Sequence, residues 1–204
     1  MYLFGASGHC KVIIDIIQKS NIEIIEEVVD DNPVKDEISN IPIVKTPNDD
    51  FFIGKSLIIS IGDNEIRKKI SCRISANYLV AIHPNAILAS NVSVSIGSVI
   101  MAGAIINSDV QIGKHSIINS GAVVEHDCFL GDFVHISPNV SLAGNVFIGE
   151  GSQIGIGAAI IQGIKIGKWA TIGAGAVILR DVPDYAVVVG NPGKIIKYNS
   201  IVNE

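Results

Sequence analysis

The chain has few charged residues for its size. Charged side chains make up 17% of its 204 residues, compared with about a quarter in a typical soluble protein. Aliphatic, aromatic and cysteine residues together make up 48%. So few charges cannot cover the whole surface of a molecule of this length. We therefore expect part of the surface to be buried by self-association.

The sequence also lacks the marks of membrane insertion, export and nucleic-acid binding. No apolar run reaches the roughly 18 residues that a transmembrane helix needs. Gly5 and Gly8 interrupt the short apolar start and no basic segment precedes it, so we expect no signal peptide. A net charge of −5, without a dense cluster of lysine and arginine, argues against nucleic acid as a partner.

Cysteine is scarce as well. Cys10, Cys72 and Cys128 are odd in number and form no CxxC motif, which argues against a disulfide framework. This usage is typical of a reducing compartment and predicts a cytoplasmic location.

What the sequence has in abundance is an aliphatic residue at every sixth position. From Ile82 to Ile178, all seventeen positions in steps of six hold Ile, Val or Leu. The residue two places earlier is usually small, as at Ser98 and Ala122. A period of six fits neither a helix nor a simple strand, and it is typical of a parallel β-helix whose coils stack their aliphatic residues. Because the register never slips, we expect no long loop within this segment.

The residues before Ile82 follow a different pattern. It predicts strands at 2–4, 24–29 and 56–61, a helix with Val12, Ile13, Ile16 and Ile17 on its buried face, and a second helix at 65–76. Strands alternating with helices indicate a small Rossmann-like α/β domain with a parallel sheet. We therefore predict an α/β domain at 1–81, an all-β helix at 82–182 and a C-terminal tail at 183–204.

Three polar turns follow the predicted strands. They are Gly5-Ala-Ser-Gly-His9, Asp30-Asp31 and Gly62-Asp-Asn64. Ligands of parallel sheets bind at the carboxyl ends of the strands, where these turns should meet. The first turn reads GxxGH rather than GxGxxG, which favours a mononucleotide diphosphate at the helix N-terminus over a dinucleotide.

The stretch VVEHDCFLG places three ionisable residues inside the aliphatic repeat. Taken alone, Glu125, His126 and Asp127 are either a solvated corner of a coil or a catalytic group. The imidazole pKa suits a general base, and a neighbouring carboxylate can fix its tautomer. His126 should point outward, because it lies two residues after the inward Val124. The register of Cys128 predicts a buried thiol rather than a nucleophile.

The motifs taken together resemble one enzyme family. GASGH, VDD, SIGDNEIRKKI, NSGAVVEHD, FVHIS and LAGNV are similar to segments of the bacterial nucleotide-activated 4-amino-sugar N-acetyltransferases of the hexapeptide superfamily, such as the enzyme of bacillosamine synthesis. The resemblance spans nearly the whole chain. It implies a left-handed β-helix with three sides and about 18 residues per turn. It also implies a homotrimer with sites at subunit interfaces, acetyl-CoA along the coils, a nucleotide-activated amino sugar in the N-terminal domain, and no metal.

The resemblance also implies roles for individual residues. His126 would be the general base and Asp127 the acid that orients it, although the bacillosamine branch has Glu in place of Asp127. The residues implied in acetyl-CoA binding are His135, Gly144, Ile156 and Ala174. The residues implied in the nucleotide-sugar pocket are Ser7, Gly8, His9, Asp30, Asp31 and Gly62. The backbone N–H of Gly144 is our candidate donor to the oxyanion.

The predicted reaction is direct transfer of acetyl from acetyl-CoA to the 4-amino group of a UDP- or dTDP-linked 4-amino-4,6-dideoxyhexose. Three alternatives remain open: a sugar O-acetyltransferase of the sialic acid type, a non-catalytic β-helix binding module, and a β-helix hydratase with histidine-bound zinc. The hydratase would need His115, His126 and His135 to converge. Their spacing puts them at different phases of the repeat, which makes convergence within one chain an unfavourable hypothesis.

Overall fold

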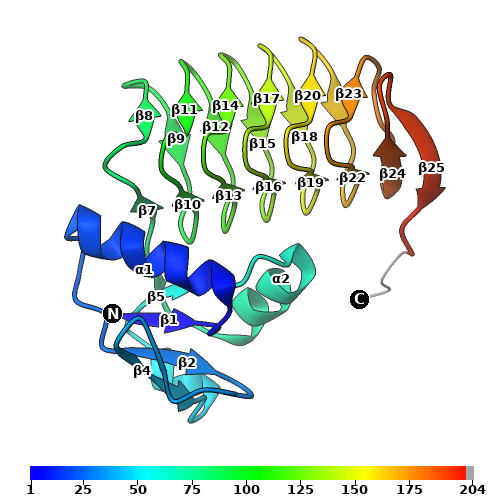
Figure 1. The fold of residues 1–204 in the computed structure, drawn as a ribbon. Helices are drawn as coiled ribbons and strands as arrows, with labels where there is room; N and C mark the ends of the chain where they lie inside the picture. Colours follow the sequence, from blue (N-terminus) through cyan, green and yellow to red (C-terminus); the bar gives the residue numbers. More distant parts are fainter. Residues whose placement is uncertain (201–204) are drawn as a thin grey trace.

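The computed structural model describes residues 1–200 and shows a small α/β domain packed against a long solenoid (Figure 1). The α/β domain has one six-stranded sheet in the order β3-β4-β2-β1-β5-β6, parallel except for the β3–β4 pair. Its strands are β1 (Tyr2–Phe4), β2 (Glu27–Asp30), β3 (Glu37–Ile38), β4 (Ile41–Lys45), β5 (Ser56–Ile59) and β6 (Asn77–Tyr78). Its helices are α1 (Gly8–Ser20), α2 (Asn64–Arg73) and a short 3-10 turn η1 (Asp49–Phe52). Within residues 1–200 neither α-helix has the length and apolar character needed to cross a bilayer.

The predicted elements of this domain are present, with corrections at their ends. The second strand begins at Glu27 rather than residue 24, and Ile24 is 85% exposed. The reason is that the Ile24 carbonyl accepts a hydrogen bond from the Met1 amino group, outside the sheet. Val12 is 40% exposed and Ile14 takes its place on the buried face of α1. The third strand ends at Ile59, and α2 spans Asn64–Arg73 rather than 65–76.

The solenoid consists of two-residue strands spaced six residues apart. They are β7 (Ala81–Ile82), β8 (Ile87–Leu88), β9 (Ser93–Val94), β10 (Val99–Ile100), β11 (Ile105–Ile106), β12 (Gln111–Ile112), β13 (Ile117–Ile118), β14 (Val123–Val124), β15 (Phe129–Leu130), β16 (His135–Ile136), β17 (Ser141–Leu142), β18 (Phe147–Ile148), β19 (Gln153–Ile154), β20 (Ala159–Ile160), β21 (Lys165–Ile166), β22 (Thr171–Ile172) and β23 (Val177–Ile178). The longer strands β24 (Ala186–Val189) and β25 (Lys194–Tyr198) close its far end. No long loop interrupts the repeat, as predicted.

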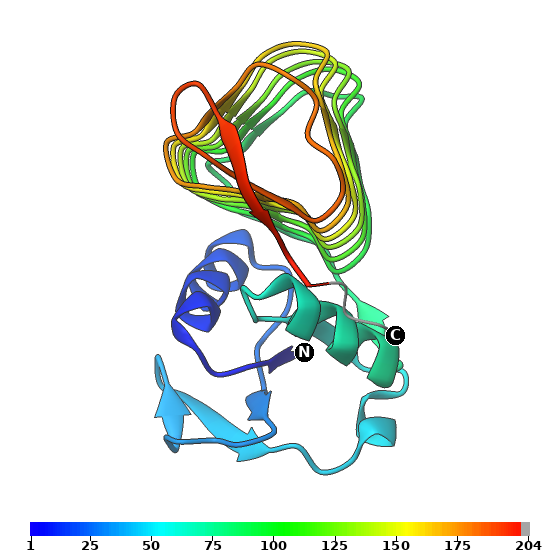
Figure 2. The same ribbon diagram turned by 90° about the vertical axis from the view of Figure 1, so that its right-hand side faces the viewer.

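Each coil contributes one strand to each of three parallel sheets, and the solenoid is triangular in cross-section (Figure 2). Partners in a sheet are 18 residues apart, for example Ile100 and Ile118. The eight-stranded face is β25-β24-β22-β19-β16-β13-β10-β7, the six-stranded face is β23-β20-β17-β14-β11-β8, and the five-stranded face is β21-β18-β15-β12-β9. The six-residue period therefore arises from three sides of six residues each.

The aliphatic residues of the repeat fill the inside of the solenoid. From Ile100 to Ile178 each is at most 2% exposed, whereas the three in the first coil are only partly buried because they lie at the open end. Small residues between them allow the corners to turn tightly. Where the small residue is serine, its hydroxyl donates to a backbone carbonyl, as Ser98 does to Gly113 at 2.8 Å and Ser152 does to Gly167 at 2.6 Å. These bonds satisfy polar groups that would otherwise be costly to bury.

The α/β domain packs on the eight-stranded face. Buried isoleucines of α1 share one apolar cluster with Ala81, Val99 and Ile117 of the solenoid. Figure 1 shows both helices beside the coils. They cover opposite faces of the sheet, because α1 packs with Leu3 and Ile58 whereas α2 packs with Phe4 and Ile59. This packing brings His9, in the turn after β1, close to His135 of β16.

Candidate active site

The predicted catalytic pair lies at the corner between β14 and β15, which we call the His126 corner. Asp127 takes the left-handed conformation there, with φ of 60°, and the His126 carbonyl accepts a hydrogen bond from Asn145 in the next coil at 2.8 Å. The His126 side chain is 61% exposed and points out of the solenoid. The corner therefore presents an imidazole that is fixed by backbone bonds at its base and open to a substrate at its tip.

The imidazole is also held by its neighbour. Nδ1 of His126 and Oδ2 of Asp127 are 2.7 Å apart. With Nδ1 donating its proton to Asp127, the lone pair of the neutral ring resides on Nε2, the nitrogen that would accept a proton. The hydrogen bond to Asp127, with the charges of Asp127 and Glu125, raises the pKa of His126 above its usual value.

Gly144 lies directly against the imidazole, one coil further along. A Cβ at Gly144 would be 2.6 Å from Cε1 and 2.7 Å from Nε2 of His126. Any side chain there would push the ring away, which explains why glycine occupies this position. Within residues 1–200 the Gly144 N–H donates no hydrogen bond, so it is available to a bound oxyanion.

The other predicted acetyl-CoA residues lie elsewhere on the coil. Ile156 and Ala174 are exposed in the turns after β19 and β22, one above the other, at what we call the Ile156 corner. His135 is in β16 on the eight-stranded face, facing the α/β domain. The six-stranded face separates the Ile156 corner from the His126 corner. One chain therefore does not bring these residues together with His126.

His9 and His135 meet at the junction of the two domains. Their ring centroids are 6.4 Å apart, and Nε2 of His135 is 3.1 Å from Nδ2 of Asn119. Burial, with a smaller contribution from Arg67, lowers the pKa of each histidine to about 4. Nε2 of His9 and Nδ1 of His135 are buried and have no hydrogen-bond partner within residues 1–200. Both rings are thus neutral at pH 7, and each has one buried nitrogen without a hydrogen-bond partner within residues 1–200.

The first polar turn borders a cleft of about 250 Å³ at the N-terminus of α1. It is lined by Ala6, Ser7, Gly8, Lys11, Lys35, Glu37, Ile38 and Ser39. Ser7 occupies the N-cap position, yet its hydroxyl makes no capping bond. Free helix N–H groups together with two lysines suit an anionic group.

The two adjacent aspartates have structural partners of their own. Asp30 accepts hydrogen bonds from the backbone N–H groups of Ala6 and Asn32, both at 2.9 Å, and so ties β2 to the first turn. Asp31 accepts from Thr46 at 2.7 Å and from both Nη atoms of Arg73, at 2.9 and 3.1 Å. The Arg73 bond lowers the pKa of Asp31. Both aspartates line a second cleft of about 250 Å³, which also contains Lys69 and Arg73.

Arg67 on α2 is a residue that the sequence-based assignment of site residues missed. It is 1% exposed, and its Nη1 donates to the carbonyls of Ile61 and of the predicted site residue Gly62, both at 3.1 Å. A signal was present in the sequence: Arg67 precedes Ile70 and Ile74 at helical spacing, which places an arginine on the apolar face of α2. A charge on such a face indicates a specific buried partner.

The remaining cysteine and histidine predictions can be placed as well. Cys128 is 1% exposed, its thiol donates to the Ala143 carbonyl at 3.3 Å, and burial raises its pKa, so it is the buried thiol that its register predicted. His115 is buried against Phe133 at a third corner, which the five-stranded face separates from the His126 corner. It lies two residues before Ile117, the strand partner of His135. Within residues 1–200 no group of three metal-ligating side chains converges.

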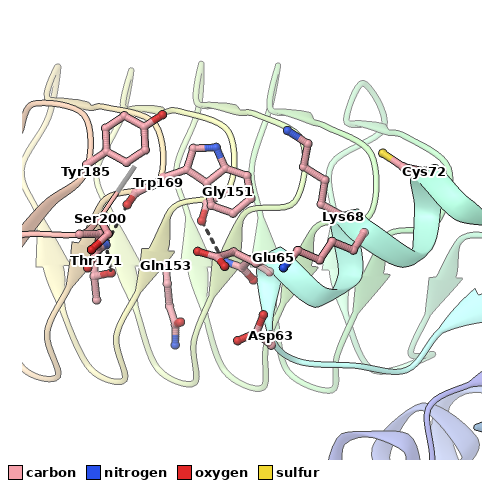
Figure 3. Close-up of a pocket in the computed structure, with 13 residues that line it drawn as sticks. Asp63, Glu65, Lys68, Cys72, Gly151, Gln153, Trp169, Thr171, Tyr185 and Ser200 are labelled. Carbon is pink, nitrogen blue, oxygen red and sulfur yellow. Dashed lines mark hydrogen bonds between the residues drawn. The ribbon is translucent and has the colours of Figure 1, made fainter. Parts of the chain in front are cut away.

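A cleft of about 650 Å³ contains none of the predicted site residues. It lies between α2 and the third corner, which we call the His115 corner and which includes His115, Phe133, Gly151 and Trp169. Figure 3 shows Trp169 and Tyr185 on the solenoid side and Glu65 and Lys68 on the side of α2. Lys68 is bound to Glu150 at 3.0 Å and lies 5.4 Å from the centre of the Trp169 ring. The cleft marks the seam between the two domains.

Comparison with protein families matches both parts of the chain. Residues 1–74 match the PglD N-terminal domain, and residues 145–180 match the bacterial transferase hexapeptide (six repeats). No curated protein sequence gives a match.

Solved structures are similar over nearly the whole chain. A variant of the perosamine N-acetyltransferase from Caulobacter crescentus, in complex with CoA and GDP-perosamine, is 35% identical, with 96% of each chain covered and a TM-score of 0.89. The acetyltransferase domain of PglB from Neisseria gonorrhoeae is 34% identical, with 96% of this chain and 98% of that chain covered and a TM-score of 0.86. WeeI from Acinetobacter baumannii is 28% identical with the same coverage and TM-score. The chain therefore belongs to the hexapeptide-repeat acetyltransferases with a PglD-type N-terminal domain, the family of nucleotide-amino-sugar N-acetyltransferases.

Proposed function

We propose that this protein transfers the acetyl group of acetyl-CoA to the 4-amino group of a nucleotide-linked 4-amino-4,6-dideoxyhexose. The observation that carries the proposal is the His126 corner. It combines an exposed imidazole, a carboxylate bound to Nδ1 of that ring, and a glycine packed against the ring. The perosamine enzyme supports it, since two of its solved forms carry a replaced histidine in complex with CoA and GDP-perosamine.

The geometry supports a direct transfer. The amine nitrogen attacks the thioester carbonyl carbon while Nε2 of His126 takes a proton from that nitrogen. Asp127 stabilises the imidazolium, and the Gly144 N–H donates to the oxyanion. The C–S bond then breaks, and the imidazolium returns its proton to the CoA sulfur. Cys128 is inward and buried, so no acyl-enzyme step is included.

We propose that the working site is formed between copies of the chain in a homotrimer. His126 and Gly144 occupy one corner, whereas Ile156 and Ala174 occupy another, with the six-stranded face between them. An extended cofactor that contacts both sets is accommodated when the His126 corner of one copy meets the Ile156 corner of its neighbour. The low charge content of the chain is consistent with such burial.

The nucleotide sugar would be held by the α/β domain. The cleft beside Ser7 and Gly8 offers helix N–H groups and lysines for a diphosphate, and Asp30 shapes the turn that forms it. His9 and the Gly62 loop lie between this cleft and the coils, where the sugar would approach the solenoid. Asp31, already bound to Arg73 and Thr46, would act with Arg73 at the second cleft. We also propose a cytoplasmic location, in keeping with three unpaired cysteines.

The test is thiol release from acetyl-CoA with a panel of UDP-, dTDP- and GDP-linked 4-amino-4,6-dideoxysugars. We expect turnover with one nucleotide series and its loss in His126→Ala. Turnover with hydroxyl acceptors alone would mean that the protein is a sugar O-acetyltransferase instead. Acetyl-CoA binding by calorimetry serves as the second readout, and a protein that binds no acetyl-CoA would contradict the proposal outright.

A further inference from the structure

Side chains of α2 bind the backbone of three successive coils at the His115 corner. Nε of Arg67 donates to the His115 carbonyl at 2.7 Å, and its Nη2 donates to the Phe133 carbonyl at 3.0 Å. Nδ2 of Asn64 donates to the Gly151 carbonyl at 3.0 Å. These three carbonyls are equivalent positions of consecutive coils, because the sheet register repeats every 18 residues. The helix is therefore aligned along the solenoid axis by backbone atoms rather than by side-chain packing alone.

The same arginine also holds the loop that leads into α2. Nη1 of Arg67 donates to the carbonyls of Ile61 and Gly62, and Nη2 donates to Oδ1 of Asn64 at 2.8 Å. All three nitrogens of the guanidinium are thus used, and they join two parts of the molecule. The planar guanidinium of Arg67 therefore fixes the distance between the Gly62 loop and the His115 corner.

The burial of this charge is unusual. Arg67 is 1% exposed, and within residues 1–200 its hydrogen-bond acceptors are four carbonyls and one amide oxygen, with no carboxylate. Burial lowers the pKa of Arg67 to about 9, which still leaves it charged at pH 7. The charge of nearby Asp63 opposes this lowering of the pKa but makes no hydrogen bond with the guanidinium. A buried charge without a bonded counter-ion adds little stability, whereas a rigid guanidinium that fits several acceptors holds them at fixed positions.

We propose that Arg67 is a positioning residue for acetyl transfer: it sets the Gly62 loop, and with it the amino sugar, at a fixed place relative to the coils. This inference rests on the proposed function, since it concerns the same nucleotide-sugar pocket. The cleft between α2 and the His115 corner lies along the same seam (Figure 3). Arg67 itself touches no substrate in this scheme and acts through the Gly62 backbone.

The test compares Arg67→Met and Arg67→Lys with Ile74→Ala. Ile74 ends the same helix, is 2% exposed and packs only within the α/β domain core, so it controls for loss of stability. For Arg67→Met we expect KM for the nucleotide sugar to rise and kcat to fall, each by about tenfold, with acetyl-CoA affinity within about twofold of wild type. Arg67→Lys should recover part of the loss. Ile74→Ala should lower the melting temperature without changing KM.

Hydrogen–deuterium exchange supplies a readout that does not depend on turnover. Arg67→Met should speed exchange at residues 60–63 and in α2 while the coil strands stay protected. Unchanged exchange there, or a KM equal to that of wild type in a variant as destabilised as Ile74→Ala, would overturn the proposal. If wild-type protein turned over no amino sugar, the proposed function would fail, and the exchange data would still decide whether Arg67 fixes the loop. If Arg67→Met did not fold, Arg67→Lys would be judged by the same two measurements.

Discussion

The His126 corner and the His115 corner are built from the same backbone turn but give their histidines opposite properties. Asp127 and His115 both take the left-handed conformation, with φ of 60° and 52°. The His115 ring stacks on Phe133 at 5.3 Å and is covered by the α/β domain, and burial lowers its pKa to about 4. His126 faces outward beside Asp127, which raises its pKa. His115 itself holds the left-handed position of its turn, whereas His126 lies one residue before it. The position in the turn and the neighbouring groups together decide whether the ring is buried or exposed.

The largest effects should come from removing each histidine side chain in turn: one variant should lose activity and the other stability. His126→Ala should lower kcat by about 10²–10⁴-fold, because it removes the proposed general base, while stability stays near wild type, because the side chain is exposed. His115→Ala should instead cost about 3 kcal/mol of stability, the range for a buried stacked ring. Steady-state kinetics and urea unfolding of both variants check this. A His115→Ala variant as stable as wild type would contradict the structural role of His115, and a fully active His126→Ala variant would contradict the proposed role of His126.

The stability of the fold should fall at acid pH because of the buried histidines. The pKa values of His9, His115 and His135 lie at about 4 in the folded protein, below the unfolded value of 6.5. Their contribution to stability is complete above pH 6.5 and is lost as the pH falls through 6.5 toward 4, because the unfolded chain then binds protons that the folded chain does not. Urea unfolding between pH 7.5 and 4.5 should show this decline. His115→Phe should reduce its slope, and an unchanged slope would contradict the assignment.

Gly144→Ala probes how closely the His126 corner is built. The added methyl would meet Cε1 and Nε2 of His126 at 2.6 and 2.7 Å and must displace the ring. We expect kcat to fall by about tenfold or more, since small displacements of a catalytic group are costly. Calorimetry should show acetyl-CoA binding that changes less than kcat does. Wild-type kcat would mean that the ring has room to move without consequence.

The smallest effect should follow from Asp127→Asn. Removal of the carboxylate lowers the pKa of His126 toward its ordinary value, so the acid limb of kcat/KM should move to lower pH. The maximal rate should fall as well, because the imidazolium loses its partner at 2.7 Å. A pH–rate profile of both proteins measures the shift, and a move of the limb to higher pH would be the wrong sign for this mechanism.

The two domains differ in how much of them could be predicted from the sequence. The solenoid was predictable in detail because every side of every coil buries an aliphatic residue at the same position, which gives a regular six-residue period. The α/β domain offered single strands and helices without repetition. Its elements were recognised, but Ile24 was placed in a strand although its carbonyl binds the chain terminus outside the sheet.

The site shows the same limit. The outward direction of His126 followed from its register, and Cys128 was correctly placed inside. Arg67 was missed because its partners, the carbonyls of residues 115 and 133, belong to another domain and carry no side-chain signal. Asp30 and Asp31 were recognised as site candidates, but their bonds to Ala6 and Arg73 depend on tertiary packing.

Mixed oligomers show whether an acetyl-transfer site joins the His126 corner of one copy to the Ile156 corner of another. One chain carries His126→Ala and the other carries Ala174→Trp, a substitution that obstructs the exposed Ile156 corner. Each should be inactive alone. When the chains are co-expressed in equal amounts, each site has an intact His126 corner in half of cases and an intact partner corner in half, so about a quarter of wild-type activity should return. If oligomers shown to contain both chains recovered no activity, the site would not be shared between two copies.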